Sequence, residues 1–533
     1  MKRQFDSISS TDFDVIVIGG GIVGAGIARD STLRGFNTLL VEKQDFGYGT
    51  TSRSTRLIHG GLRYLRQLEF GLVRQDLSER EVLLQIAPHL VHPLTFLIPI
   101  HNTFLNITMA IGVTLYDIMS YDKTLPNHAY LNRKKTLEQE PGLKVRNLQG
   151  SYVYYDCQIP FPERLNFETA LSAAENGATI LNHARVTKLL IDGNRIFGVE
   201  VRDELTGVTA QAKGKLIVNA AGHWVDQIKD MALPRSKPYL LRTKGIHIVI
   251  PKVSNNALVL FSPTDNRLFF VVPWEGFSLV GTTDTVYNDN LDEVYATNEE
   301  VEYLLDGLHL AYPDVNINDV YYTMAGLRSL ALKPGKSASD TSRSHRLIDH
   351  NKLNGLEGMI TVLGGKITAY RAVARDATDL ICEKLGKKAR CTTAEHGLPG
   401  SPAMNKEEIN WLAQKECLTD DIVHNLADIY GSRCRNVLEL TKFDERGKQL
   451  ISSSGHDIIA QIWYSVKEEC CMTLNDFMWR RSGIAFRKDQ GLDAVNTVAE
   501  EMKKLLNWNE RELEKQIDEF HAAVELGQRF KNK

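Results

Sequence analysis

The stretch DVIVIGGGIVGAGIARDSTLRGFNTLLVE, residues 14–42, decides the fold of this chain. An apolar strand runs into a glycine turn, a helix and a second apolar strand, which is the order of a βαβ unit. Gly19, Gly21 and Gly24 form the pattern GxGxxG at the turn, where the N–H groups of a helix start can bind a pyrophosphate. Glu42 ends the second strand, where a carboxylate can accept hydrogen bonds from a ribose. The stretch therefore predicts a dinucleotide site.

Three further segments favour FAD over NAD, which shares the ADP half of FAD. Gly364 and Gly365 follow the apolar run MITVL and open a helix, whose positive terminus could face the negative charge of a reduced flavin. The run TTSRSTRLIHGGLRY at residues 50–64 offers hydroxyls and glycines, and LIVNAAG at residues 216–222 ends a strand in small residues. Each segment alone could be an ordinary turn or a solvated loop. Together they predict that FAD also contacts Thr51, Ser52, His59, Gly60, Ala220, Gly222, Gly364 and Gly365. Val186, in the run of expected strands at residues 178–201, is a further predicted cofactor contact.

The pattern of strands and helices predicts three domains. Apolar runs separated by turns over residues 240–283 indicate an antiparallel sheet, and a strand, glycine pair and helix over residues 359–379 return to the first domain. After residue 395 the chain shows helical periodicity with many charges. We expect an FAD-binding domain of residues 12–90, 150–235 and 340–394, a substrate domain of residues 91–149 and 236–339, and a helical domain of residues 395–533.

Composition excludes several classes of function. The formal net charge of -3 gives no basic surplus for nucleic acid, and the seven cysteines show no metal-binding spacing, which favours a reduced compartment and no metal site. Residues 93–116 contain no Asp, Glu, Lys or Arg, but Pro93, Pro99 and three polar residues break the run, which argues against a spanning helix. We expect a buried helix there, or a face resting in the bilayer interface.

Several motifs occur in the order typical of one family. They are LIHGGLRYL at residues 57–65, SEREVLLQIAPHL at 78–90, KGIHIVIP at 244–251, VVPW followed by GTTD at 281–284, GLRSL at 326–330 and LGGKITAYR at 363–371. With them the chain resembles the FAD-dependent, respiratory glycerol-3-phosphate dehydrogenases. The helical C-terminal part is similar in type, with less diagnostic motifs.

The resemblance implies an α/β (α+β) fold with a Rossmann-type FAD-binding domain of the glutathione-reductase/D-amino-acid-oxidase type. It implies oxidation of sn-glycerol 3-phosphate to dihydroxyacetone phosphate, with electrons passed through FAD to a membrane quinone. It also implies a homodimer bound peripherally to the inner face of the cell membrane. A phosphorylated substrate calls for cations and hydrogen-bond donors, and those in or near the motifs are Arg63, Tyr64, Arg343, Lys366 and Thr368.

Two residues are candidates for the chemistry. His247 is the first candidate for the base that takes the hydroxyl proton, although its apolar neighbours also suit a packed histidine. Arg328 is expected to polarise the C2 oxygen, because an arginine stays charged. The base could be His247, Arg328 or another group. Three alternatives stay open: a peroxide-forming oxidase, a flavin-binding sensor without turnover and an NAD-linked dehydrogenase. The resemblance implies that oxidases of this family carry an extra insertion in the middle of the chain. No such insertion is evident in the sequence, which favours the quinone-linked enzyme over the oxidase.

Overall fold

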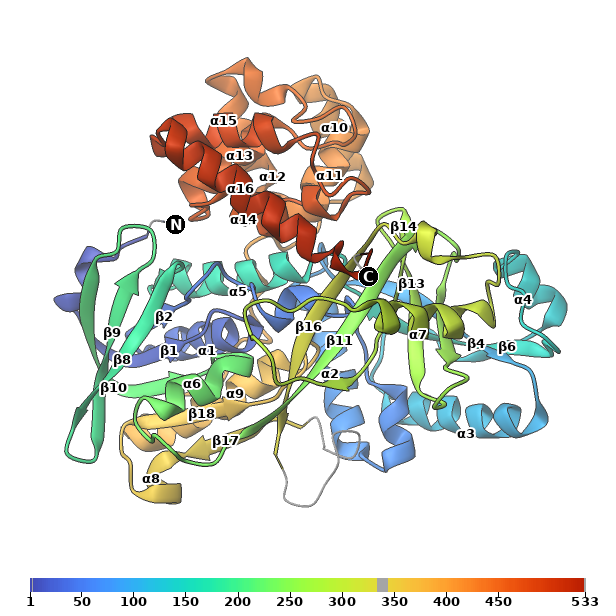
Figure 1. The fold of residues 1–533 in the computed structure, drawn as a ribbon, viewed down its shortest axis with the longest axis horizontal. Helices are drawn as coiled ribbons and strands as arrows, with labels where there is room; N and C mark the ends of the chain where they lie inside the picture. Colours follow the sequence, from blue (N-terminus) through green and yellow to red (C-terminus); the bar gives the residue numbers. More distant parts are fainter. Residues whose placement is uncertain (2, 333–343, 532–533) are drawn as a thin grey trace.

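A parallel sheet forms the first layer of the protein (Figure 1). The computed structural model describes residues 1, 3–332 and 344–531, with the side chains of Arg63 and Arg66 outside the described part. The strands follow the order β17-β18-β10-β1-β2-β7, and β17 alone on this path runs antiparallel to its neighbour. Their bounds are Asp12–Ile18 (β1), Thr38–Val41 (β2), Thr179–Leu181 (β7), Thr209–Asn219 (β10), Arg346–Asp349 (β17) and Met359–Leu363 (β18).

Helices pack on this sheet and a hairpin extends it. Buried residues of α1 share one core with α5, α9 and strands β1, β10 and β18. The helices are Ile22–Leu33 (α1), Pro162–Glu175 (α5), Val225–Asp230 (α6), His350–Asn354 (α8) and Tyr370–Leu385 (α9), and the hairpin is Ala184–Asp192 (β8) with Arg195–Asp203 (β9). The expected βαβ unit is therefore present, with parallel pairing of β1 to β2.

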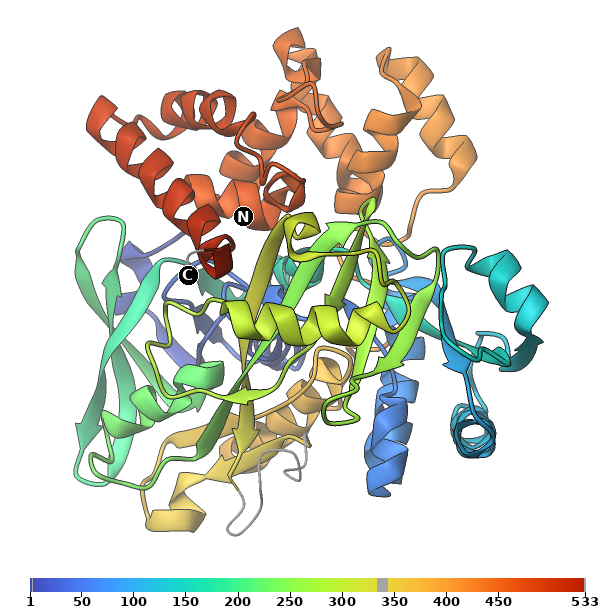
Figure 2. The same cartoon turned by 45° about the vertical axis from the view of Figure 1, so that its right-hand side comes forward.

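A second, mostly antiparallel sheet lies beside the first, as the apolar runs predicted (Figure 2). Strand β11 pairs with β14, β15 and β16, and the path continues through β13, β12, β4 and β6 to β3, with β5 on β6. The bounds are Leu57–Ile58 (β3), His92–Ile100 (β4), Ala129–Asn132 (β5), Gly150–Gln158 (β6), Leu240–Pro251 (β11), Ala257–Phe261 (β12), Leu268–Trp274 (β13), Phe277–Gly281 (β14), Thr285–Val286 (β15) and Tyr322–Ala331 (β16). Helices Arg133–Gln139 (α4) and Asn298–His309 (α7) accompany this sheet.

The strands β3 and β6 differ from the expected domain boundaries. Both lie in segments assigned above to the FAD-binding domain, yet they pair within the second sheet. Strand β6 aligns with the whole of β4, from His92 opposite Gln158 to Ile100 opposite Gly150. Because β4 and β6 read as separate apolar runs in the sequence, their pairing could not be inferred from either run.

The expectation of a buried helix over residues 93–116 is wrong. The first part of the segment is strand β4, and helix α3 follows at Thr103–Met119, capped by Asn102, whose side chain accepts a hydrogen bond from the N–H of Leu105. One face of α3 exposes large apolar side chains, while Val113 and Tyr116 are buried against the body. Helix α2 (Phe70–Ile86) lies beside it. Among the described residues, none of the helices is long and apolar enough to cross a membrane.

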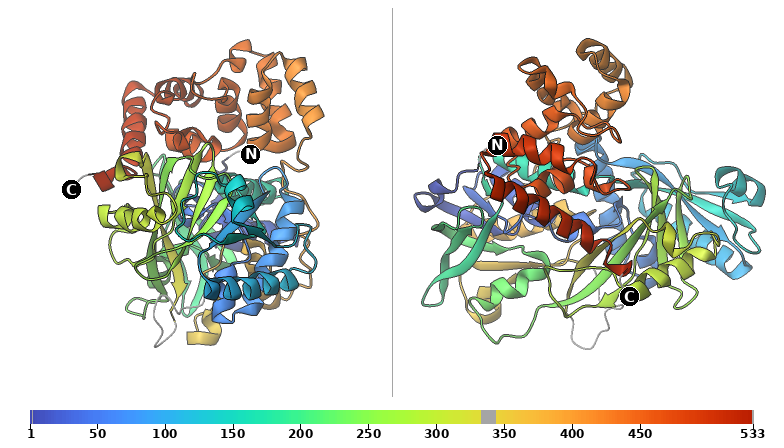
Figure 3. Two further views of the ribbon diagram at one scale, coloured as in Figure 1. Left: turned by 90° about the vertical axis from the view of Figure 1, so that its right-hand side faces the viewer. Right: turned by 45° about the horizontal axis from the view of Figure 1, so that its top comes forward.

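The C-terminal part is a helical domain with its own apolar core, and it sits against one side of the two sheets (Figure 3). Its helices are Lys406–Glu416 (α10), Asp420–Tyr430 (α11), Cys434–Glu439 (α12), Ile459–Glu468 (α13), Leu474–Asp476 (α14), Val495–Leu506 (α15) and Glu510–Leu526 (α16). Buried ion pairs join it to the first domain, since Asp45 accepts hydrogen bonds from Arg480 and Arg481. The end of α16 meets β16, where Thr323 donates its N–H to the carbonyl of Gly527 at 2.9 Å.

Candidate active site

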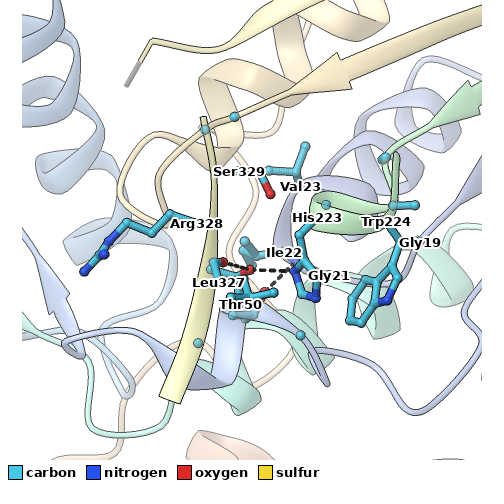
Figure 4. A pocket seen from close by; sticks show the side chains of 18 of the residues that line it. Gly19, Gly21, Ile22, Val23, Thr50, His223, Trp224, Leu327, Arg328 and Ser329 are labelled. Carbon is cyan, nitrogen blue, oxygen red and sulfur yellow. Dashed lines mark hydrogen bonds between the residues drawn. The ribbon is translucent and has the colours of Figure 1, made fainter. Parts of the chain in front are cut away.

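A cavity of about 580 Å³ lies where the two sheets meet. The glycine turn after β1, the loop after β2, the loop after β10 and the loop after β18 line it from the first sheet, and β11 and β16 line it from the second. Figure 4 shows Arg328 on one side and the glycine turn on the other, with Thr50 between them. Thr50 donates a hydrogen bond to the carbonyl of Leu327 at 2.6 Å, which ties the loop of one sheet to a strand of the other.

The glycine turn packs backbone against backbone. Gly19 has φ of +108°, and a Cβ there would lie 2.6 Å from the carbonyl oxygen of Ala220. A Cβ on Gly24 would lie 1.9 Å from the carbonyl oxygen of Gly19. Gly21 instead faces the cavity, with Thr51 as its nearest neighbour at 3.5 Å. The first and third glycines therefore allow the close packing, and the second leaves room for a phosphate to approach the helix start.

Glu42 lines the cavity as predicted, and the chain holds its carboxylate in place. One oxygen accepts the N–H of Gly20 at 2.7 Å and the other accepts the N–H of Gln44 at 2.9 Å. Burial raises the pKa of this carboxyl, while the two N–H groups oppose that shift. Because each carboxylate oxygen has two lone pairs, acceptor capacity is left for the ribose hydroxyls of an adenosine.

The loop after β18 brings several predicted residues to the cavity. Gly364 and Gly365 have φ of +70° and +105°, which the left-handed region allows for glycine. Helix α9 begins only at Tyr370, so the pair does not open the helix directly and the expected helix terminus lies further along the chain. The wall of the cavity also contains the predicted residues Thr51, His59, Val186, Ala220 and Gly222.

Ser52 and Gly60 lie outside the cavity wall. The Ser52 hydroxyl is 3.2 Å from the carbonyls of Tyr48 and Gly49, to which it donates within its own loop. The N–H of Gly60 donates to the hydroxyl of Tyr116 at 2.8 Å, and a Cβ on Gly60 would lie 2.6 Å from Leu77. These two residues position the loop, and their predicted contact with a cofactor has no geometric support.

His247 on β11 lies in the wall of the cavity and is 2% exposed. Its Nε2 is 2.9 Å from the hydroxyl of Thr55, and its buried Nδ1 has no hydrogen-bond partner among the described residues. Burial, with the positive charges of Arg328 and Arg56 nearby, lowers the pKa of His247 to about 3. The imidazole is therefore neutral at physiological pH and keeps one ring nitrogen as an acceptor, although it is a weak base in the unliganded protein.

Arg328 on β16 reaches the same cavity and is held by the GTTD segment. Its guanidinium donates to the carboxylate of Asp284 at 3.1 Å and to the hydroxyl of Thr282 at 2.8 Å. Gly245 leaves the space that the side chain needs, since a Cβ there would lie 2.2 Å from the guanidinium. The geometry orients a fixed cation on the side of the cavity opposite the glycine turn (Figure 4).

The predicted phosphate ligands are described in part. Lys366 lies 3.9 Å from the centroid of the Tyr64 ring and forms an ion pair with Asp76, and Tyr64, Lys366 and Thr368 all line the cavity. Thr368 accepts a hydrogen bond from the N–H of His59 at 3.2 Å. Arg343 and the side chain of Arg63 lie outside the described residues.

Comparisons with known proteins agree with the residues in this cavity. Residues 14–371 match the family described as FAD dependent oxidoreductase, and residues 391–513 match the C-terminal domain of alpha-glycerophosphate oxidase. A glycerol-3-phosphate dehydrogenase of Synechocystis sp. is 38% identical, with 98% of both chains covered. An aerobic glycerol-3-phosphate dehydrogenase of Staphylococcus haemolyticus is 34% identical, with 97% of this chain and 95% of that protein covered. The chain belongs to the FAD-dependent glycerol-3-phosphate dehydrogenase family.

The fold of a family member agrees with this assignment. The glycerol-3-phosphate dehydrogenase from Bacillus halodurans, solved in complex with FAD, superposes with a TM-score of 0.79 at 29% identity, covering 98% of this chain and 96% of that chain. The cavity fits FAD, because close backbone packing at Gly19 and Gly24 leaves Gly21 and Glu42 facing it. The roles of individual residues toward FAD and substrate stay predictions.

Sequence reasoning missed two features of this flavoenzyme site. His223 and Trp224 follow the LIVNAAG motif, line the cavity and have ring centroids 3.5 Å apart, with Lys43 over the indole at 3.8 Å. Their position directly after a predicted cofactor strand was the available signal. Asp76, the partner of Lys366, is fully buried on α2, and burial raises its pKa to about 6. Nothing in the sequence pairs an aspartate on α2 with a lysine almost three hundred residues later.

Proposed function

We propose that this enzyme oxidises sn-glycerol 3-phosphate to dihydroxyacetone phosphate and passes the electrons to a membrane quinone. The observation that carries the proposal is one cavity whose wall contains both the glycine cradle and the side chains of His247, Arg328 and Lys366. A dinucleotide cofactor, a base and cations for a phosphate are the groups that this oxidation needs.

Lys366, Tyr64 and Thr368 would bind the substrate phosphate, together with Arg63 and Arg343. Lys366 is 14% exposed and pairs with an aspartate that is fully buried, so its ammonium group is fixed at the cavity wall. A fixed ammonium group beside a hydroxyl donor suits a dianionic phosphate. The remaining part of the substrate would then lie toward His247 and Arg328.

His247 would take the proton from the C2 hydroxyl while C2–H leaves as hydride. When bound, FAD supplies the two-electron acceptor for that hydride. Arg328 would hold the C2 oxygen as negative charge develops on it, because its guanidinium is already oriented by Asp284 and Thr282. A bound phosphate dianion raises the proton affinity of His247 above its value in the free enzyme, which favours the transfer.

Helix α3 supports the quinone as electron acceptor. Phe104, Ile107, Ile111 and Ile118 lie on one face of α3 and are 81%, 59%, 64% and 65% exposed. Such an apolar stripe suits the interface of a bilayer, where quinones reside. On the buried side of α3, Tyr116 accepts the N–H of Gly60, next to the cavity residue His59. The membrane-facing side would thus lie against the substrate end of the cavity, with the enzyme as a homodimer on the inner face of the cell membrane.

Steady-state turnover tests the function. We expect the FAD-loaded protein to reduce a short-chain quinone with glycerol 3-phosphate as electron donor and to produce little peroxide in air. The match of residues 391–513 to a domain of alpha-glycerophosphate oxidase makes a peroxide-forming oxidase the second candidate. Peroxide formed in proportion to substrate would select the oxidase, and FAD binding without turnover would select a sensor.

Liposome sedimentation tests membrane attachment separately from turnover. The double variant Phe104→Ser/Ile107→Ser should lose at least about half of its lipid-bound fraction, because two exposed apolar side chains no longer enter the interface. Phe443→Ser is the matched control, since Phe443 is 88% exposed and lies between α12 and α13 of the helical domain, which is on another side of the molecule from α3 (Figure 1). Equal binding of the double variant and the wild type would remove α3 from the membrane contact.

A further inference from the structure

A second cavity, of about 790 Å³, lies between the helical domain and the two sheets. The body contributes the loop after β2 with Tyr48 and Arg53 and the middle of β16, and the helical domain contributes Trp479, Trp508 and the inner face of α16. Rings and side-chain amides make up much of the wall. The cavity is distinct from the cofactor cavity, and Arg53 lines both.

Nearly all charged side chains of this wall already have a partner of opposite charge. Ion pairs join Glu293 to Arg529, Lys515 to Glu512 and Glu519, Glu204 to Arg185, and Asp476 to His183 and Arg480. Arg53 differs from them, because no carboxylate within the described residues lies in ion-pair distance of its guanidinium. Its guanidinium donates a hydrogen bond to the neighbouring Ser52 hydroxyl at 3.1 Å and lies 6.0 Å from the centroid of the Trp479 ring.

The charged groups around Arg53 are of both signs. Arg56 and Arg480 lie close to it, and the nearby carboxylate of Glu163 is bound to both terminal nitrogens of Arg56 at 3.1 Å. Burial and these two cations lower the pKa of Arg53. Arg53 is partly exposed at the wall of both cavities, and an oxyanion that accepts two of its N–H groups would supply the counter-ion that it lacks among the described residues.

The guanidinium is directed to the second cavity. The guanidinium of Arg53 lies over the ring of Trp479, and Trp479 lines the second cavity but not the cofactor cavity. The Cβ and Cγ of Arg53 pack beside Gly326 of β16. Helix α3 lies at the end of the molecule away from the helical domain, so the second cavity is remote from the proposed membrane face (Figures 1 and 3). Its ligand is therefore expected to arrive from water.

We propose that this second cavity binds a water-soluble, ring-bearing carboxylate, whose carboxylate pairs with Arg53 and whose ring packs among Trp479, Trp508 and Tyr48. One uncompensated cation matches one negative charge, which favours a carboxylate over a phosphate dianion. The aromatic wall suits a planar ring. Arg53 is a binding residue here and takes no part in the oxidation.

Calorimetric titration of the FAD-loaded full chain tests this site with nicotinate and its neutral isostere nicotinamide. Nicotinate should bind at least about tenfold more tightly than nicotinamide, since the shapes match and only the charge differs. The variant Arg53→Gln should weaken the binding of nicotinate by about tenfold or more. The control variant Arg529→Gln removes a cation of the same wall that is already paired, and it should weaken the binding of nicotinate by less than about twofold. Inorganic phosphate in place of nicotinate is expected to bind more weakly.

Several results would overturn the proposal. They are undetectable nicotinate binding, equal binding of nicotinate and nicotinamide, and unchanged binding in Arg53→Gln. Loss of binding when glycerol 3-phosphate saturates the enzyme would place nicotinate in the cofactor cavity, and tighter binding of phosphate would overturn the choice of a carboxylate. If Arg53→Gln fails to retain FAD, the nicotinate-to-nicotinamide ratio of the wild type decides alone. None of these readouts depends on turnover, so failure of the proposed oxidation would be seen separately.

Discussion

The two ends of the cofactor cavity are built in different ways. The nucleotide end uses mainly residues 14–42, where glycines allow close backbone packing and two N–H groups fix the carboxylate of Glu42, and the carbonyl of Ala220, directly after β10, packs against Gly19. The substrate end uses side chains from β11, β16 and the loop after β18, and other buried side chains fix them. A local stretch can therefore specify a cofactor cradle, whereas the reacting groups depend on the whole fold.

The largest expected effect is at the cradle. Gly24→Ala places a Cβ 1.9 Å from the carbonyl oxygen of Gly19. Gly24 lies within α1, and the N–H of Gly19 donates to the carbonyl of Val41 on β2 at 2.8 Å, so neither backbone moves freely. We expect the purified variant to hold less than about a tenth of the wild-type FAD or to fail to fold. The flavin-to-protein absorbance ratio measures this. Gly71→Ala on α2 is the control, because a Cβ there meets nothing within 4 Å; full FAD content in Gly24→Ala would contradict the close-packing argument.

At the substrate end, His247→Gln should lower kcat by about 10² to 10⁴ without loss of FAD, because a base contributes on that scale. The glutamine keeps a hydrogen-bonding group near Thr55 but cannot take a proton. The measurement is anaerobic reduction of the bound flavin by glycerol 3-phosphate in a stopped-flow instrument. Reduction within about tenfold of the wild-type rate would assign the base to another group.

The contrast between the two ends also explains what the sequence could predict. The spacing of Gly19, Gly21, Gly24 and Glu42 is a local property, and the βαβ unit and the antiparallel second sheet follow from local periodicity. The amphipathic helix α3 was mistaken for a buried one, because an uncharged run does not reveal which face the fold leaves exposed. Asp76 was missed since its meaning depends on Lys366, which only the packing of α2 against the loop after β18 brings near.

Asp76→Asn tests whether the buried carboxylate that positions Lys366 lowers the free energy of unfolding. The folded-state pKa of about 6 exceeds the ordinary value of 3.8, so the folded protein binds more protons between these values and loses stability as pH rises through that window. Two pKa units correspond to about 3 kcal/mol. Relative to wild type, the variant should therefore gain up to about 3 kcal/mol between pH 3.8 and pH 7, while its KM for glycerol 3-phosphate rises as Lys366 loses its anchor.

Thermal melts of the two FAD-loaded proteins at pH 4.5 and pH 7.5 give the sign of this effect. The difference in Tm, variant minus wild type, should be more positive at pH 7.5. The opposite trend would mean that the ion pair with Lys366 outweighs the burial of Asp76.

Glu42→Gln should have the smallest effect, and it is the matched test at the nucleotide end. Both oxygens of Glu42 accept backbone N–H groups, whereas a glutamine amide offers one acceptor and turns an N–H group toward the other donor. With one acceptor oxygen in place of two, the glutamine would also leave a ribose hydroxyl without its acceptor, and loss of that hydrogen bond costs about 1 to 2 kcal/mol, which corresponds to roughly tenfold weaker FAD binding. Titration of the apoprotein with FAD, followed by flavin fluorescence, measures it. KM for glycerol 3-phosphate should stay unchanged in this variant and rise in Asp76→Asn, because each carboxylate serves its own end of the cavity; a rise in KM with unchanged FAD affinity in Glu42→Gln would mean that the two ends are not independent.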